Sequence, residues 1–186
     1  QGTYLMFLNN DTEVHPQFLE PMVEDMEQNP TIGIVASKLH FYHTPNVIQF
    51  AGSTPLHPIR MASYAVGYGE TDTGQYDDKM FTHLAHGAAM MVKKSVIQKA
   101  GLMPEEYFLY YEEIDWCERI KKAGYRILFE PKSLVYHKES ISVGKKSAFQ
   151  LYYKTRNRIL LARRWRKGLT KYLTMSYLGS VAIRDL

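Results

Sequence analysis

A run of five apolar residues, Tyr4–Leu8, is followed at once by five polar residues. An uninterrupted apolar run of this length is typical of a strand buried in a parallel sheet. Open α/β sheets bind ligands at the carboxyl ends of their strands, so the polar segment stands where a ligand site is expected. A turn with a helix N-cap would explain the same residue types. The polar residues are Asn9, Asn10, Asp11, Thr12 and Glu13.

Helical and strand patterns alternate along the rest of the chain, which indicates an α/β fold. The spacing of apolar residues predicts helices over residues 16–28, 94–100, 112–123 and 147–165. Short apolar runs predict strands over residues 32–36, 38–42, 47–51, 83–92, 125–129 and 134–137, with Pro131 separating the last two. Residues 52–80 are expected to form a long loop and residues 169–183 a weakly amphipathic tail.

The charges are divided unevenly between two parts of the chain. Ten Lys and Arg residues lie between Lys145 and Lys171, and no carboxylate occurs from Ser140 to Arg184. The first 144 residues are therefore acidic, although the whole chain carries a net charge of +4. A basic tail of this kind favours an anionic partner, such as a membrane surface, nucleic acid or phosphates.

Two features bear on the compartment. Cys117 is the single cysteine, which excludes an internal disulfide framework and favours a reducing environment. No signal-peptide pattern and no apolar run near the ~20 residues of a membrane span occurs in the sequence. We therefore expect a cytoplasmic protein, with its basic tail at the inner face of a membrane.

Four carboxylates follow an aromatic run within residues 107–118, namely Glu112, Glu113, Asp115 and Glu118. Carboxylates beside buried aromatic side chains lose solvation, which is tolerated where they bind a cation or accept a proton. This stretch therefore predicts the catalytic edge of an enzyme. Asp115 and Arg119 have i, i+4 spacing on the predicted helix, so an ion pair that makes Asp115 structural is also expected.

Three separated segments, taken together, resemble the inverting family 2 glycosyltransferases with the GT-A fold. They are residues 7–13, residues 87–92, and residues 108–115 continuing through 124–126 to Tyr136 and His137. Residues 152–158 also resemble a segment of rhamnosyl- and galactofuranosyltransferase-like members. The resemblance implies that residues 1–144 are the C-terminal part of a GT-A domain, which is Rossmann-like with a mixed sheet. Residues 145–186 would then be a basic helical extension that contains a long helix.

The resemblance assigns a donor and metal site. The family's DxD motif matches Asn9-Asn10-Asp11, so Asp11 would bind a divalent cation, Mg²⁺ or Mn²⁺, while Asn9 replaces the second carboxylate. A cation there would neutralise the charge of the leaving diphosphate. His137 matches a position that completes the metal shell in galactofuranosyltransferase-like relatives, and imidazole favours Mn²⁺. Gly87 and Ala88 would line the floor between donor and acceptor.

The resemblance also assigns the base. Glu113 matches the position of the family's general base, where the family has Asp, and Asp115 is the alternative base. Glu112 would lie in the acceptor pocket. Trp116 would stack on a sugar ring of the acceptor, with packing in the core as the other interpretation.

The implied reaction is a single in-line displacement that transfers a sugar from a nucleotide-sugar to a saccharide or lipid-linked acceptor. The implied pathway is synthesis of cell-surface polysaccharide or lipopolysaccharide. The family's nucleoside-binding half precedes the DxD strand, and the resemblance implies that this chain lacks it. We therefore expect the chain alone to bind nucleotide-sugar poorly or not at all. A carboxylate-pair glycoside hydrolase is one alternative, although it would leave residues 9–11 without a role. A basic module for nucleic acid is another, but the acidic body would repel phosphates, so no nucleic-acid partner is expected.

Overall fold

The computed structural model describes residues 2–138 and 147–184. The strands are β1 (Tyr4–Leu8), β2 (Thr12–Val14), β3 (Ile32–Phe41), β4 (Thr44–Phe50), β5 (Met80–Thr82), β6 (Ala89–Lys93) and β7 (Arg126–His137). The helices are α1 (Glu20–Gln28), α2 (Lys94–Ala100), α3 (Glu112–Lys122), α4 (Ala148–Trp165) and α5 (Gly168–Arg184), with a 3₁₀ turn at Glu105–Tyr107.

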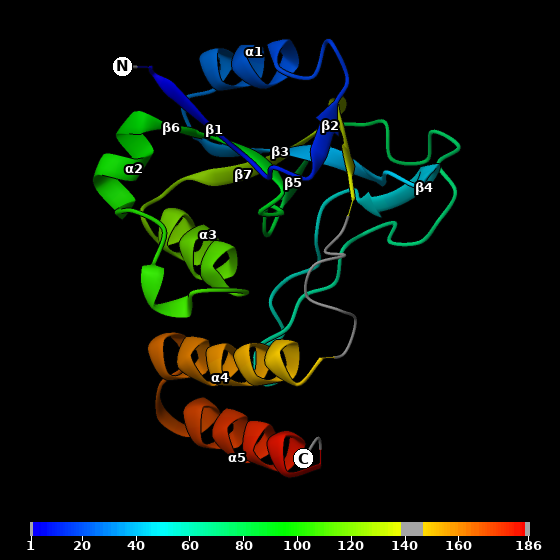
Figure 1. The fold of residues 1–186 in the computed structure, drawn as a ribbon. Coiled ribbons are helices and arrows are strands. Elements are labelled where there is room, and N and C mark those ends of the chain that lie inside the picture. The colour runs from blue at the N-terminus through cyan, green and yellow to red at the C-terminus, as the bar shows by residue number, and fades with distance from the viewer. Residues whose placement is uncertain (1, 139–146, 185–186) are drawn as a thin grey trace.

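The strands form one mixed sheet with the order β1-β6-β3-β7-β2, to which β4 adds beside β3 and β5 beside β7. The central pair, β3 and β7, is parallel, and the other pairs are antiparallel. Helix α1 covers one face of the sheet, and α2 and α3 cover the other (Figure 1). Beyond α3, α4 and then α5 form two further layers (Figure 1). The α/β class and the mixed sheet are thereby confirmed.

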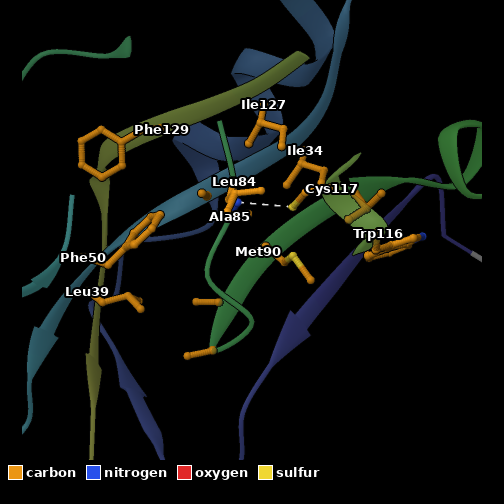
Figure 2. Packing of buried hydrophobic residues seen from close by; sticks show 14 of the residues in the cluster. Ile34, Leu39, Phe50, Leu84, Ala85, Met90, Trp116, Cys117, Ile127 and Phe129 are labelled. Carbon is orange, nitrogen blue, oxygen red and sulfur yellow. Dashed lines mark hydrogen bonds between the residues drawn. The ribbon is translucent and has the colours of Figure 1, made fainter. Parts of the chain in front are cut away.

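The main core lies between the sheet and α3. Trp116, Cys117 and Ile120 of α3 are wholly buried among apolar side chains of the central strands (Figure 2). The backbone N–H of Ala85 donates to the sulfur of Cys117 at 3.4 Å. Burial raises the pKa of the Cys117 thiol to about 12, so this cysteine is an inert core residue at neutral pH.

A separate cluster joins α4 and α5 to the start of α3. Leu161 and Ala162 of α4 and Leu178 of α5 pack against Tyr107 and Tyr111. Burial of apolar surface between these elements holds the two last helices on the body. The predicted helix over residues 147–165 is confirmed, and Ser147 caps it by accepting a hydrogen bond from the Gln150 N–H at 3.1 Å.

The first strand has the predicted residues but not the predicted setting. β1 pairs antiparallel with β6 and lies at the end of the strand order of the described sheet. Its side chains are only partly buried, and Leu5 and Leu8 are 37% and 43% exposed. The prediction of a fully buried parallel strand was wrong, because an apolar run reports hydrophobicity and not the number of neighbouring strands.

Three element boundaries differ from prediction for reasons that involve proline or glycine. α1 begins at Glu20 and not at residue 16, because Pro21 fits the first turn of a helix but would break its interior. Residues 83–88 precede β6 as a loop that contains Gly87. β7 continues through Pro131 instead of breaking there. The register with β3 steps from Glu130 directly to Leu134, so the proline lies in a bulge that needs no backbone donor.

Candidate active site

The carboxylate of Asp11 and the imidazole of His137 meet at the ends of two neighbouring strands. β2 and β7 are antiparallel with Thr12 opposite His137, and the Lys138 N–H donates to the Asp11 carbonyl at 3.0 Å. His137 Nε2 consequently lies 3.3 Å from Asp11 Oδ1. On its other side, His137 Nδ1 lies 2.9 Å from Gln49 Oε1. Because an amide oxygen only accepts, Nδ1 carries the proton and Nε2 faces the carboxylate.

This geometry fits two ligands of one cation. Two cis ligands, each about 2.1 Å from a metal in an octahedral shell, are separated by about 3.0 Å, close to the observed distance. The Gln49 amide supplies the outer hydrogen bond that usually fixes a metal-binding histidine. Among residues 2–138 and 147–184, no group of three or more His, Cys, Asp and Glu side chains forms a metal site. Asp11 and His137 are therefore two side chains that could hold a cation, with its other positions open to a diphosphate or water.

The floor beside this pair is formed by the loop before β6. The Asn9 N–H donates to the Ala88 carbonyl at 3.0 Å, which joins this loop to the segment that holds Asp11. The side chain of Asn10 is exposed in the adjacent turn. A Cβ on Gly87 would lie 3.8 Å from Cβ and Cγ of Glu113, so the loop also borders the start of α3.

His86 in this floor was not predicted as a site residue. Its ring centroid lies 5.8 Å from that of His137, and its Nδ1 accepts the Ala88 N–H at 3.1 Å. Nε2 therefore carries the proton of the neutral ring and is a hydrogen-bond donor. Burial, and then the neighbouring His137, lower the pKa of His86 to about 4. Its position directly before Gly87, the first residue of a segment that resembles the family, was the available signal.

Glu112 and Glu113 are the first two residues of α3, and the side chain of Glu113 borders Gly87 of the loop before β6. Oε2 of each is enclosed and has no hydrogen-bond partner among the described residues. Burial, and then the charge of Glu112, raise the pKa of Glu113 to about 7, while backbone N–H groups of the first turn oppose this rise. Burial also raises the pKa of Glu112. A carboxyl that titrates near neutrality and has a free oxygen is suited to proton transfer.

The structure excludes Asp115 as the alternative base. Asp115 is wholly buried on the face of α3 that meets α4. One oxygen accepts from Arg119 at 3.0 Å and from Arg164, and the other accepts from the indole N–H of Trp165. The predicted ion pair with Arg119 is confirmed. Because both carboxylate oxygens are occupied by donors, Asp115 is a structural residue.

Trp116 is likewise excluded as a sugar-stacking residue. Its side chain has no exposed surface, its indole N–H donates to the Gly101 carbonyl at 2.8 Å, and its ring packs edge-on against Phe7 at 5.1 Å. The prediction of acceptor contact was wrong, and the alternative of core packing is correct. Trp116 packs into the core against the sheet (Figure 2). Glu112 and Glu113 instead form the first turn of α3.

The sheet and its helices have the architecture of the GT-A glycosyltransferases. The chain is similar to GalNAc-T7 solved with UDP, GalNAc and Mn²⁺, with a TM-score of 0.66 and 16% identity, covering 88% of this chain and 32% of that one. It is also similar to the mannosyltransferase PcManGT from Pyrobaculum calidifontis in complex with GDP-Man and Mn²⁺. That comparison has a TM-score of 0.50 and 14% identity, covering 98% of this chain and 45% of the other.

The chain belongs to the family described as glycosyltransferase like family 2, whose model matches residues 2–161. It is therefore a glycosyltransferase domain. The match extends into α4, and the predicted division at residue 144 stays a prediction.

Two curated relatives carry named activities. The low-salt glycan biosynthesis hexosyltransferase Agl10 of Haloferax volcanii is 32% identical over 108 residues, which is 55% of this chain and 35% of that protein. The N-acetylglucosaminyl-diphospho-decaprenol L-rhamnosyltransferase of Mycobacterium tuberculosis is 31% identical over 101 residues, covering 53% and 33%. The matched part of the chain thus spans about a third of the length of these relatives.

Proposed function

We propose that the intact protein transfers a sugar from a nucleotide-sugar donor to a saccharide or lipid-linked saccharide acceptor, with inversion at the anomeric carbon. The observation that carries this proposal is the convergence of the Asp11–His137 pair, the Gly87–Ala88 floor and the free carboxylate of Glu113. These are the parts that a single displacement needs: a place for the leaving diphosphate and a base for the attacking hydroxyl.

Glu113 acts as the general base. It takes the proton of the acceptor hydroxyl as the acceptor oxygen bonds to the anomeric carbon. The bond from that carbon to the diphosphate oxygen breaks at the same time, and its electron pair leaves with the nucleotide diphosphate. The pKa of Glu113, raised to about 7 mainly by burial, makes it a stronger base than an exposed glutamate. Glu112, one residue before it, contacts the acceptor.

The nucleotide-sugar donor binds at the residues that follow β1 and end β7, namely Asn9, Asn10, Asp11 and His137. A divalent cation, Mg²⁺ or Mn²⁺, held by Asp11 and His137 would neutralise the charge that develops on the diphosphate. The GalNAc-T7 and PcManGT structures both contain Mn²⁺, which supports this choice. Gly87 and Ala88 lack large side chains, so a sugar can lie close to the backbone there.

We also propose that the acceptor is carried by a membrane lipid, in cell-surface glycan synthesis, and that α5 contacts the inner face of that membrane. Among the described helices, none combines the length and apolar character that crossing a bilayer requires. Instead α5 exposes Leu169, Tyr172 and Leu173 on one face, at 74%, 75% and 52%, beside Lys167 and Lys171. Apolar residues flanked by lysines suit an anionic lipid surface. The diphospho-decaprenol acceptor named for the mycobacterial relative supports a lipid-linked acceptor.

The stereochemical outcome tests this reaction type. The intact protein should be incubated with candidate nucleotide-sugars and lipid-diphosphate saccharides, and the product's anomeric configuration read by NMR. Inversion relative to the donor supports the proposal. Retention of configuration, or release of free sugar without transfer, would exclude a single displacement onto an acceptor.

A further inference from the structure

The backbone that leads into α3 has an unusual conformation. Among the described residues, only four non-glycine residues have positive φ, and three of them are Phe108 (62°), Tyr110 (66°) and Tyr111 (76°). Aromatic residues rarely adopt this region, and each such residue costs on the order of 1–3 kcal/mol. Tyr111 is the residue that caps α3, and Glu112 and Glu113 follow it directly. Contacts from outside the segment must therefore hold this conformation.

Asn157 of α4 supplies these contacts. Its side chain is wholly buried, and its Nδ2 donates to three carbonyl oxygens of the segment. The distances are 2.8 Å to Tyr107, 2.6 Å to Leu109 and 2.9 Å to Tyr110. Its Oδ1 accepts from Arg156 at 2.6 Å, which orients the amide so that both N–H bonds point at the segment. One side chain thus satisfies the carbonyls of Leu109 and Tyr110 and adds a second donor to that of Tyr107, which also accepts from the Leu109 N–H at 2.7 Å.

Two further residues of α4 contact the same aromatic side chains. Arg158 Nε donates to the Tyr111 hydroxyl at 3.0 Å, and Gln150 Nε2 donates to the Tyr110 hydroxyl at 3.2 Å. α4 is therefore bound along much of its length to the entry of α3. Through these hydrogen bonds, Arg158 and Gln150 contact only side-chain hydroxyls, whereas Asn157 contacts backbone carbonyls of the segment.

We propose that Asn157 is a positioning residue of the active site: it fixes the backbone before α3 and thereby sets the position and enclosure of the Glu113 carboxylate. This role rests on the proposed function of Glu113 as the base, because a positioning residue has meaning only through the group that it places. It makes α4 part of the catalytic scaffold. Catalytic geometry is sensitive to displacements of about 1 Å, so release of this segment would reduce turnover.

The test replaces Asn157 by Leu, which is uncharged and similar in volume like Asn but has no hydrogen-bond donor in its side chain. The carboxyl titration of Glu113 is followed in this chain by ¹³C NMR and assigned by its loss in Glu113→Gln. Release of the segment exposes the carboxyl to water, so the pKa of Glu113 should fall by one unit or more, a tenfold change in proton affinity. Thr174→Val is the matched control, because Thr174 is equally buried and donates to a loop carbonyl, that of Pro58, at 3.1 Å. It should leave the titration unchanged.

A folded Asn157→Leu variant with the wild-type Glu113 titration would overturn the proposal. Asn157→Ser keeps one donor in a smaller side chain and serves if the leucine variant does not fold. If neither folds, the wild-type protein decides: the Asn157 side-chain N–H protons should exchange with water far more slowly than those of exposed Asn10. Equal exchange rates would show that Asn157 does not hold the backbone before α3 and would overturn the proposal. Loss of the base role in an activity assay would refute the proposed function and leave these titration results intact.

Discussion

The His137 imidazole lies 3.3 Å from the Asp11 carboxylate, although 126 positions separate the two residues in the sequence. The antiparallel pairing of β2 with β7 creates this contact, and Gln49 fixes the ring by accepting from its other nitrogen. With the Nδ1 proton donated to Gln49, the Nε2 atom faces Asp11 Oδ1, which has no hydrogen-bond partner among the described residues.

A cation at this pair predicts localised binding of Mn²⁺. Titration of the chain with Mn²⁺ should broaden the NMR signals of Asp11 and His137 before those of other acidic residues, because the ion is paramagnetic. Asp11→Asn should lower the affinity at least tenfold by removing the charged ligand. Asp78→Asn makes the same charge change at an exposed residue and should have little effect. Broadening spread equally over the acidic surface in all three proteins would refute the site.

The raised pKa of Glu113 predicts how stability changes with pH. Its folded-state pKa of about 7 lies above the ordinary value of 4.5, so folding favours the protonated form. This contribution to stability is present below pH 4.5 and is lost as the pH rises through 7. Glu113→Gln removes the dependence and should therefore gain stability over the wild type above pH 7, by up to about 3 kcal/mol.

The effect must be measured as a difference between variants, because the contribution of His86 to stability changes with pH in the opposite direction. Its folded-state pKa of about 4 lies below the ordinary 6.5, so its contribution is lost as the pH falls from 6.5 to 4. Urea unfolding of wild type, Glu113→Gln and Glu118→Gln at pH 4.5 and 8 measures the effect. A Glu113→Gln difference that does not change between these pH values would contradict a raised pKa of Glu113.

Asp115 is predicted to matter for stability. Asp115→Asn removes the buried carboxylate charge that pairs with the partly exposed side chains of Arg119 and Arg164, which should destabilise the protein by about 3 kcal/mol. Glu118→Gln breaks the neighbouring pair with Lys121, which is more exposed, and should cost less than about 1 kcal/mol. Equal losses in chemical unfolding would show that burial does not distinguish the two pairs.

The contact of α5 with lipid predicts a charge-dependent affinity for vesicles. Replacing Lys167 and Lys171 by Ala removes about 1 kcal/mol each, which is roughly a 30-fold loss of binding to vesicles rich in phosphatidylglycerol. The matched double variant Lys94→Ala/Lys132→Ala removes two exposed charges from the body and should bind nearly as the wild type does. Flotation that is the same for both double variants, or on neutral vesicles, would argue against α5 as the contact.

Local sequence signals identified much of the fold. The apolar runs located β1 and the central strands, and spacing located α2, α3 and α4 nearly to the residue. The motif segments predicted that Asp11, Glu113 and His137 belong to one site, and the structure brings their segments together.

Other features depend on tertiary contacts that no local pattern encodes. Trp116 and Asp115 follow the glutamates on the same helix, and only the packing of α3 between the sheet and α4 decides which side chains are buried. The role proposed for Asn157 depends on the positive φ angles of Phe108, Tyr110 and Tyr111, which cannot be predicted from aromatic residues in the sequence. β7 can continue through Pro131 only because of the bulge in its pairing with β3, and this pairing is not visible in the local sequence.

The most direct test of the proposed mechanism is the turnover of Glu113→Gln in the intact protein, measured with donor binding in the same preparation. Loss of the base should lower kcat by about 10²–10⁴, while calorimetry shows donor affinity within a few-fold of wild type. Glu118→Gln, the same substitution five residues further along α3, should retain wild-type turnover. Wild-type turnover in Glu113→Gln would contradict the assignment of Glu113 as the base.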